Sequence, residues 1–392
     1  MSNPECSGVT WPELAEGFEQ RLQRDISEAV VVRSPGRLNL LGEHTDYNGG
    51  LVLPIAIDRA TWVIAAPAEG RVRVWAEAMG EEDCFDPADF AADSELLWAN
   101  YIRGVLLALG ERGIHLGGAD VLVTGDLPLG AGVSSSASLE TGCGLAFAAL
   151  AGAEVPAREM ALLCQHVENA FVGVNCGIMD QFAVGLCEPG SALLLDCRTL
   201  ETRSVALAAG TPVFFVCDTN KPRTLAASAY NQRRAECEGA ARHFGKDTLR
   251  DVTLEMVERD KAILGDVVYR RCRHVLTENQ RVLDAIEVMG AGDWAAFGEL
   301  LKGSHASLRD DYEVSCEELD IMCELAQEAA GCLGARMVGA GFGGCAMAAV
   351  EADAVEGFGE TLAKKYQAAT GREPRIFAVQ AAAGAAITEA PE

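Results

Sequence analysis

Polar side chains of several chemical kinds gather in SPGRLNLLGEHTDYNGGLVLPIAID, residues 34–58. The groups in question are those of Arg37, Glu43, His44, Asp46 and Tyr47. Carboxylates accept hydrogen bonds from hydroxyl groups, and an arginine close to a carboxylate keeps it ionised and stabilises developing negative charge. Two interpretations follow, a solvated loop or a site that binds a hydroxylated molecule next to a centre of negative charge.

A glycine and serine loop, GDLPLGAGVSSSASLE at residues 125–140, lies between a β-branched run and an alanine-rich run. This order predicts a strand, a glycine loop and a helix. Glycines let the backbone approach a bulky anion, and the amino end of a helix favours phosphate. Its serine hydroxyls could also ligate magnesium. The loop lacks the lysine of a Walker A motif, and an ordinary serine N-cap is the alternative interpretation.

The stretch GARMVGAGFGGCAMAAV, residues 334–350, contains a formal G-x-G-x-x-G at Gly339, Gly341 and Gly344. These glycines lead into a predicted strand, whereas a dinucleotide fingerprint leads into a helix. A tight hairpin with close backbone packing is one interpretation. The other is a backbone wall for a bound sugar phosphate.

Two acidic residues lie in VENAFVGVNCGIMDQF, residues 167–182. Glu168 falls in a predicted helix, and Asp180 follows a glycine-containing turn. Each acid alone has an ordinary explanation, a salt bridge for Glu168 and a helix N-cap for Asp180. Together, near a phosphate loop, they suit phosphoryl transfer, which needs one carboxylate for magnesium and another to orient or deprotonate a hydroxyl group.

Mixed α and β structure must position these stretches. β-branched runs predict strands, and apolar residues three and four apart predict helices. The predicted strands are 29–34, 119–124 and 211–219, and the predicted helices are 157–171, 269–289 and 315–329. The pattern becomes mostly helical near residue 200, which predicts an N-terminal domain over 1–200 and a C-terminal domain over 201–392. The closing VQAAAGAAITEAPE is predicted to be a strand end and a frayed tail.

Composition narrows the possible partners. The 392 residues carry a formal charge of -26, which disfavours binding to nucleic acids and anionic membranes. Neither a secretory signal nor a membrane span is recognisable, so we expect a cytoplasmic protein. The 14 cysteines are scattered through apolar segments and are expected to be buried free thiols. Without C-x-x-C pairs or clustered histidines, a structural zinc site is not expected.

Taken together, these stretches resemble the galactokinase family of the GHMP kinase superfamily. SPGRLNLLGEHTDYN is similar to the galactokinase signature, and CGIMDQF to its catalytic segment. GDLPLGAGVSSSASLE and GARMVGAGFGGC resemble the second and third superfamily motifs. The resemblance covers residues 33–345 in the family's order. It implies an α+β, two-domain GHMP kinase fold, with mixed sheets, helices packed on one face and the active site in the cleft between domains.

The resemblance also implies a reaction and a set of site residues. The reaction is ATP-dependent phosphorylation of galactose at the anomeric C1 hydroxyl, as in galactose catabolism by the Leloir pathway. Asp180 matches the catalytic base and Arg37 its partner, while Ser136 and Glu168 match ligands of Mg²⁺. The matches to galactose contacts are Glu43, His44, Asp46, Gly177 and Tyr230. The matches to the ATP phosphate loop are Gly130, Ala131, Gly132, Val133, Ser134, Ser135 and Ser136. Galactose and ATP are the expected partners, and a monomer is expected.

Three positions depart from the family pattern. Val338 stands where threonine is usual, Ala229 where an acidic residue is frequent, and Val133 where leucine is usual. The first two put local side-chain contacts in doubt.

Other functions stay open at this point. The alternatives are a kinase for N-acetylgalactosamine, arabinose or galacturonate, and a noncatalytic galactose sensor on the same scaffold. The fungal sensors lack a Ser-Ala pair in the phosphate loop, and here Ser136 and Ala137 are both present. GEHTDYN favours free galactose over N-acetylgalactosamine, whose kinases resemble GEHIDYC. A dinucleotide oxidoreductase based on the third glycine stretch is a more distant alternative.

Overall fold

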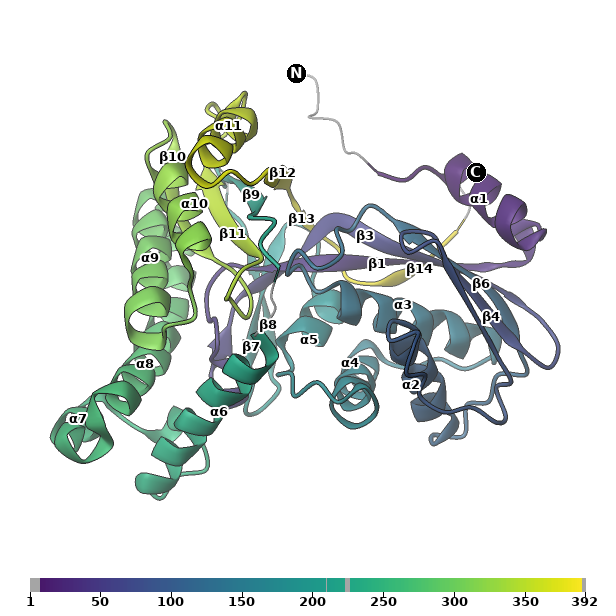
Figure 1. Ribbon diagram of the computed structural model, residues 1–392, viewed down its shortest axis with the longest axis horizontal. Coiled ribbons are helices and arrows are strands. Elements are labelled where there is room, and N and C mark those ends of the chain that lie inside the picture. Colours follow the sequence, from purple (N-terminus) through teal and green to yellow (C-terminus); the bar gives the residue numbers. More distant parts are fainter. Residues whose placement is uncertain (1–7, 209, 223–225, 390–392) are drawn as a thin grey trace.

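Figure 1 shows the computed structural model of the chain, which describes residues 8–208, 210–222 and 226–389. The molecule has two domains of mixed α and β structure. One is built on a seven-stranded sheet and the other on a four-stranded sheet, and a three-stranded sheet lies where they meet. Within the described ranges, no helix is long and apolar enough to cross a membrane.

The seven-stranded sheet has the strand order β14-β1-β3-β6-β4-β5, with β13 paired to β3. Strands β4 and β6 are parallel, and the other pairs are antiparallel. The strands are β1 (Val30–Asn39), β3 (Pro54–Pro67), β4 (Val72–Ala76), β5 (Glu81–Phe85), β6 (Ala119–Gly125), β13 (Ala381–Ala382) and β14 (Ala386–Thr388). The strands predicted at 29–34 and 119–124 are confirmed.

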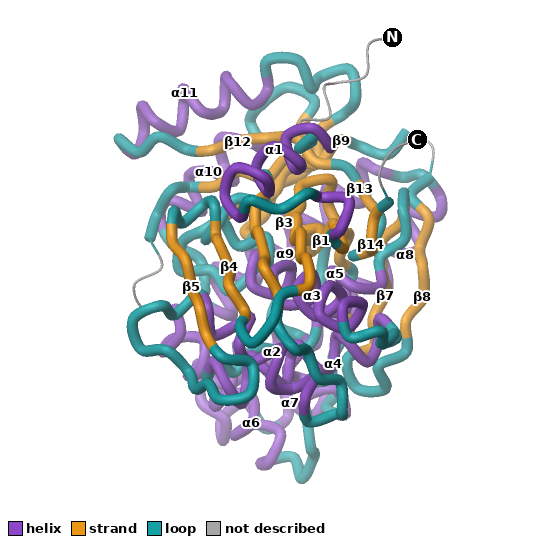
Figure 2. The backbone as a smooth tube through the Cα atoms, turned by 90° about the vertical axis from the view of Figure 1, so that its right-hand side faces the viewer, coloured by secondary structure: helices purple, strands orange, loops and turns teal. Residues whose placement is uncertain are grey.

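Most helices of this domain cover one face of the sheet, as expected (Figures 1 and 2). They are α2 (Ala99–Gly110), α3 (Ser135–Leu150), α4 (Ala157–Val167) and α5 (Met179–Leu186). Alternate strand residues such as Val32, Val63 and Val121 pack against this layer. Their neighbours Ile64 and Leu122 point to the opposite face, which helix α1 (Trp11–Leu22) covers. The sheet is therefore buried on both faces, with a single helix on the second.

The four-stranded sheet of the C-terminal domain is antiparallel throughout, in the order β10-β11-β9-β12. Its strands are β9 (Val213–Asp218), β10 (Cys332–Met337), β11 (Cys345–Val350) and β12 (Arg375–Val379). Its helices are α6 (Ala226–His243), α7 (Leu254–Arg259), α8 (Lys261–Ala291), α9 (Trp294–Ser307), α10 (Glu317–Gln327) and α11 (Phe358–Thr370). These elements confirm the strand predicted at 211–219, the helices predicted at 269–289 and 315–329, and the hairpin interpretation of the third glycine stretch.

The remaining elements are a small sheet and single helical turns. The three-stranded sheet comprises β2 (Leu51–Val52), β7 (Ser191–Asp196) and β8 (Thr202–Ala206). Single turns of 3-10 helix are Ile26–Glu28, Asp46–Asn48 and Leu249–Asp251, and π-helical turns are Glu168–Val172 and Leu308–Tyr312. Residue 200, the domain boundary predicted from sequence, lies in the turn between β7 and β8, and the boundary stays a prediction.

Two sequence predictions differ from the structure. The sequence predicts a strand over 29–34 alone, but β1 continues to Asn39 and includes Arg37. A register shift at Pro35–Arg37 lets β1 resume pairing with β3, so the strand passes through a segment that reads as a turn. The prediction of a frayed tail is also wrong as far as residue 388, because β13 pairs with β3 and β14 pairs with β1. Backbone pairing orders this segment although its composition is alanine-rich and weakly patterned.

Candidate active site

Arg37 projects from β1 into the junction between the glycine loop and helix α5. Its Nε and Nη2 atoms donate to the two carboxylate oxygens of Asp180 at 2.9 and 3.0 Å, and Nη1 donates to the Gly132 carbonyl at 2.6 Å. The preceding Gly36 lets the strand approach the loop, because a Cβ there would lie 2.4 Å from Leu127 Cδ1 and 2.8 Å from the Val133 carbonyl. Arg37 thus joins Asp180 to the loop.

The charge of Arg37 is set by its carboxylate neighbours. The side chain is almost completely buried, and burial alone would lower its pKa. Asp180 and then Glu43 outweigh that effect and raise the pKa of Arg37. A permanent cation therefore lies at the base of the cavity.

Asp180 lies in the first turn of α5, which brings its carboxylate to the end of the glycine loop. Besides Arg37, the hydroxyl of Ser134 donates to Asp180 Oδ2 at 2.5 Å. The side chain keeps 31% of its exposure, so a bound molecule can still reach it. A carboxylate held by a bidentate arginine and open on one side is suited to orient a hydroxyl group or to take its proton.

The glycine loop, residues 126–134, leads from β6 into α3 as the sequence predicts. Ser134 adopts a left-handed conformation with φ 61° immediately before the helix, and the first amide groups of α3 have no partner within the helix. Of the seven loop residues predicted to surround phosphates, Ala131 and Val133 have buried side chains in the hydrophobic core. These two can offer backbone groups alone, and Ser134 is also buried, so Gly130, Gly132, Ser135 and Ser136 form the accessible surface.

Glu168 lies in the π-helical turn that follows α4, and only 5% of its surface is exposed. Burial raises the pKa of the Glu168 carboxyl, and a contact with the Ser136 hydroxyl acts in the opposite direction. A carboxylate and a hydroxyl are the hard oxygen ligands that Mg²⁺ prefers, and Mg²⁺ usually completes its shell with water and phosphate oxygens. Among the described residues no group of three or more His, Cys, Asp or Glu side chains could hold a metal. The pair therefore fits a metal that arrives with phosphates.

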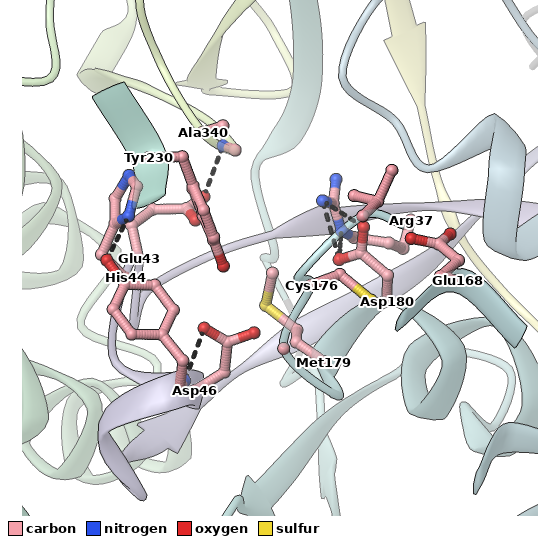
Figure 3. Close-up of a pocket in the computed structure, with 14 residues that line it drawn as sticks. Arg37, Glu43, His44, Asp46, Glu168, Cys176, Met179, Asp180, Tyr230 and Ala340 are labelled. Carbon is pink, nitrogen blue, oxygen red and sulfur yellow. Dashed lines mark hydrogen bonds and ion pairs between the residues drawn. The ribbon is translucent and has the colours of Figure 1, made fainter. Parts of the chain in front are cut away.

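A cavity of about 280 Å³ brings together most of the predicted residues (Figure 3). From the N-terminal domain, β1 and the following loop contribute Arg37, Glu43, His44 and Asp46, and the segment around α5 contributes Glu168, Gly177 and Asp180. From the C-terminal domain come Tyr230, Gly339 and Ala340. The cavity therefore lies between the two domains, as expected, and the third glycine stretch forms part of its wall.

Glu43 is held from the C-terminal domain. Its Oε1 atom accepts a hydrogen bond from the Gly339 amide at 2.9 Å and lies 3.2 Å from Arg336 Nη2. Arg336 is completely buried, and it also donates to the Leu40 carbonyl at 2.8 Å. The carboxylate is thus oriented by two groups nearly 300 positions away in the sequence.

His44 is a buried residue in a left-handed conformation, with φ 61°. Burial lowers the pKa of its ring to about 3, so the imidazole is neutral at pH 7. Nδ1 lies 2.9 Å from the hydroxyl of Tyr47, whereas Nε2 makes no hydrogen bond of ordinary geometry among the described residues, and the Ala340 backbone lies beside the ring. The rings of Tyr47, Tyr230 and Tyr312 surround it, with centroids 5.0 to 5.9 Å away. The second ring nitrogen is therefore buried in the wall of the cavity, beside the Ala340 backbone.

Asp46 begins a turn of 3-10 helix beside the turn before α5. Burial, and then the nearby charge of Asp180, raise the pKa of its carboxyl to about 6. Gly177 leaves the space that Asp46 occupies, because a Cβ there would come within 1.6 Å of Asp46 Oδ2. The predicted role of Gly177 in the site thus has a steric reason.

Tyr230 approaches the same cavity from α6. Its ring lies 5.1 Å from that of Tyr47, and burial raises the pKa of its hydroxyl well above 10, so this group carries a proton that it can donate. Val338, in contrast, is completely buried in the hydrophobic core, and its amide pairs with the Cys345 carbonyl. A side chain at position 338 faces away from the cavity.

A second cavity, of about 290 Å³, was not predicted from the sequence. It lies on the other side of the glycine loop, and Ser135 and Ser136 form one wall. Its larger apolar residues are Met79, Trp98, Tyr101, Leu127, Leu129 and Leu139. The lining residues come from β6, α2, α3 and the loops and share no short sequence motif. The cavity is therefore apparent only in three dimensions, where these residues lie beside the phosphate loop.

Glu140 is another site residue that the sequence did not single out. It lies one turn after Ser136 on α3 and is completely buried. Burial, and then the nearby Glu168, raise the pKa of Glu140 well above its ordinary value. A completely buried carboxyl group with a raised pKa thus lies next to Glu168.

Comparison with known proteins agrees with this geometry. Residues 16–67 match the galactokinase galactose-binding signature, 100–188 the N-terminal domain of GHMP kinases and 283–368 their C-terminal domain. A galactokinase of Roseiflexus sp. is 48% identical over 378 residues, which cover 95% of this chain and 96% of that protein. A galactokinase of Chloroflexus aurantiacus is 45% identical over 92% of this chain and 94% of that protein.

Solved structures give the same result. The crystal structure of Lactococcus lactis galactokinase complexed with galactose matches with a TM-score of 0.90 and 38% identity, over 97% of this chain and all of that one. A mevalonate kinase structure matches with a TM-score of 0.63 at 17% identity, over 90% of this chain and 98% of that one, and shows the shared fold alone.

Proposed function

This chain belongs to the galactokinase family, and on that basis we propose that it transfers the γ-phosphoryl group of ATP to the anomeric C1 hydroxyl of galactose. The products are α-D-galactose 1-phosphate and ADP. One observation carries the proposal. The Arg37–Asp180 pair lies between a cavity with several carboxylates, suited to a sugar, and a glycine loop at a helix amino end, suited to phosphate.

Asp180 orients the C1 hydroxyl and accepts its proton as the phosphoryl group is transferred. Its two oxygens are occupied by Arg37 and Ser134 on one side and remain open to the cavity on the other. Arg37 pairs with this carboxylate and offers positive charge to the developing alkoxide and to the transferring group. Glu43, His44, Asp46 and Tyr230 hold the remaining hydroxyl groups of the sugar, and Gly177 leaves room for Asp46.

ATP lies across the glycine loop. The second cavity, with its apolar walls and with Ser135 and Ser136 at one side, receives the adenine end, while the backbone of residues 130–136 surrounds the phosphates. Because Ser136 lines the second cavity and Glu168 lines the first, their contact marks the place where the two meet.

Ser136 and Glu168 hold Mg²⁺ in this proposal. Bound there with the nucleotide, Mg²⁺ neutralises phosphate charge, which is otherwise unfavourable in a chain of net charge -26. The chain itself supplies the hydroxyl and the carboxylate and keeps Glu168 shielded from solvent. The monomeric state and the cytoplasmic location expected from the sequence stay predictions.

A coupled assay of ADP release, with Mg²⁺ and ATP and a panel of sugars, tests this function. We expect turnover with galactose and weaker turnover with N-acetylgalactosamine, arabinose and galacturonate. Faster turnover with one of those three would identify that sugar, and not galactose, as the substrate. Folded protein that binds galactose without releasing ADP would instead be a sensor.

A further inference from the structure

A chain of hydrogen bonds leads from His44 through the side chains of Tyr47, Tyr312 and Cys237 into the C-terminal domain. His44 Nδ1 lies 2.9 Å from Tyr47 Oη, which lies 2.7 Å from Tyr312 Oη, which in turn lies 3.2 Å from Cys237 Sγ. Tyr312, in the π-helical turn after α9, and Cys237, on α6, are buried and do not line the sugar cavity. We call Tyr47, Tyr312 and Cys237 the relay.

Each member of the relay has one proton to donate at neutral pH. Burial raises the pKa of both tyrosines well above 10 and that of Cys237 to about 11. The ring of His44 is neutral and carries a proton on one nitrogen. Tyr47 and Tyr312 each lie between two partners and have a single proton, so both phenol protons are used and all three contacts are hydrogen bonds only when the bonds run in the same direction.

Chemistry at the two ends selects that direction. An imidazole nitrogen is a good acceptor for a phenol proton, whereas thiol sulfur is a weak acceptor and a weak donor. The favoured order is therefore thiol to Tyr312, Tyr312 to Tyr47, and Tyr47 to His44 Nδ1. That order leaves the ring proton on Nε2, the buried nitrogen that makes no hydrogen bond of ordinary geometry among the described residues.

A donor at Nε2 complements the rest of the cavity. Glu43, Asp46 and Asp180 accept hydrogen bonds when ionised, so they use the protons of sugar hydroxyls and leave the hydroxyl oxygens in need of donors. We propose that the relay holds His44 as the Nε2–H tautomer, which donates to a hydroxyl oxygen of the sugar. Tyr312 and Cys237 are then positioning residues for sugar binding. This inference rests on the proposed function for the identity of the sugar.

Nitrogen NMR of the unliganded protein, labelled with ¹⁵N-histidine, tests the tautomer directly. The chain has six histidines, and the His44→Gln variant identifies the signals of His44 by their loss. We expect the Nε2–H tautomer. A ring protonated on Nδ1 would overturn the inference, whether or not the protein phosphorylates galactose. Conversely, Nε2–H in a protein that binds no galactose would refute the proposed function while leaving the assignment of the relay intact.

Sugar affinity tests the relay itself. Tyr47→Phe leaves His44 Nδ1 without a donor, and we expect the Kd for galactose to rise about tenfold, as for the loss of a buried hydrogen bond. Tyr312→Phe should raise it by a smaller factor, about threefold, because Tyr47 keeps its own proton. The double variant should match Tyr47→Phe, since Phe keeps the ring contact of Tyr312 with His44 and the Tyr312 hydroxyl is connected to His44 only through the Tyr47 hydroxyl. In all three variants the KM for ATP should be unchanged.

Tyr366→Phe is the matched control. Tyr366 is a completely buried tyrosine of the same domain, whose hydroxyl donates to the Thr219 carbonyl at 3.1 Å, away from the cavity. We expect native galactose affinity for this variant. Effects of Tyr47→Phe and Tyr312→Phe that multiply in the double variant, or a native Kd in Tyr312→Phe, would overturn the relay. If Tyr312→Phe does not fold, the Kd for galactose of Cys237→Ala and the tautomer of His44 test the relay in its place.

Discussion

The sugar side and the phosphate side of the active site are held in place by different means. On the sugar side, the loop after β1 is fixed by buried charged and polar groups of the C-terminal domain. Glu278, on α8, accepts hydrogen bonds from the Gly42 amide at 3.0 Å and from Ser304 at 2.8 Å, and Arg336 reaches Glu43. On the phosphate side, the glycine backbone and the start of α3 form one continuous segment, which Arg37 joins to β1.

The difference corresponds to the charge of each ligand. Galactose is a neutral polyol, so carboxylates can bind its hydroxyl groups without a large electrostatic cost. ATP is a polyanion, and in a chain of net charge -26 it needs backbone dipoles, a metal and few acidic neighbours. The sugar side therefore depends on long-range ion pairs, whereas the phosphate side depends on local backbone geometry.

The largest effect is expected where the sugar side depends on a buried charge. Arg336→Met removes a completely buried cation and leaves Glu43 without its ion pair, which should cost about 3–5 kcal/mol of the free energy of unfolding. Denaturant unfolding measures this loss. Arg198→Met is the control, because Arg198 and Asp251 form an ion pair that is about 40% exposed on both sides and should contribute about 1 kcal/mol or less. Equal losses in the two variants would contradict the comparison.

Glu168→Gln tests the phosphate side. It replaces one proposed Mg²⁺ ligand with a weaker neutral one, and the Mg²⁺ concentration for half-maximal activity should rise by at least about tenfold. Titration of the activity with Mg²⁺ at fixed ATP measures it. Glu159→Gln, an exposed change on the preceding helix α4, should leave the Mg²⁺ dependence native. An unchanged Mg²⁺ requirement in Glu168→Gln would place the metal elsewhere.

Gly177→Ala separates steric from charge effects on the sugar side. The added Cβ would overlap Asp46 and displace its carboxylate, so the KM for galactose should rise about tenfold, the equivalent of a packing cost near 1.4 kcal/mol. The KM for ATP should stay native. Gly185→Ala, in the following helix α5, places its Cβ in ordinary contact with the Ala157 carbonyl oxygen at 3.6 Å and serves as control. Native galactose kinetics in Gly177→Ala would show that Asp46 is not held by this close approach.

A further effect on the sugar side concerns pH. The pKa of Asp46 is raised to about 6 in the unliganded protein, so the carboxylate that accepts sugar hydroxyls becomes protonated below pH 6. The ratio kcat/KM for galactose should therefore fall about tenfold between its plateau and pH 5. In Asp46→Asn the ratio should be low throughout and this acid limb should be absent. An acid limb unchanged in Asp46→Asn would assign the titration to another group.

The same contrast explains what could be predicted from the sequence. The glycine loop, Ser136 and the strand before it are local in sequence, so their order already indicates a phosphate site. The hairpin at Gly339–Gly344 and the long helices follow from local patterns as well. Arg336 and Glu278 could not be assigned, because they act on Glu43 and Gly42 across more than 200 residues and carry no local signal. The apolar second cavity was not predicted for the same reason. Trp98 and Leu139 read as ordinary apolar residues in the sequence, and only the fold brings them together beside the loop.

For Arg37, the sequence predicted the chemistry but not the position in the fold. Its chemistry was apparent from the sequence, and its pairing with Asp180 was implied by resemblance. Its position within a strand was not, because a strand that passes through Pro35 and Gly36 requires the register shift against β3. The two sides of the site meet at this residue.

Asp180→Asn tests the central claim most directly. Single-turnover measurement of ADP release, with saturating galactose, ATP and Mg²⁺, should show a rate lower by about 10²–10⁴-fold, because the carboxylate that accepts the C1 proton is lost. Calorimetry should show galactose affinity within about threefold of the native value, because the other hydroxyl contacts remain. Near-native turnover in this variant, with galactose bound normally, would contradict a base role for Asp180 and with it the proposed mechanism.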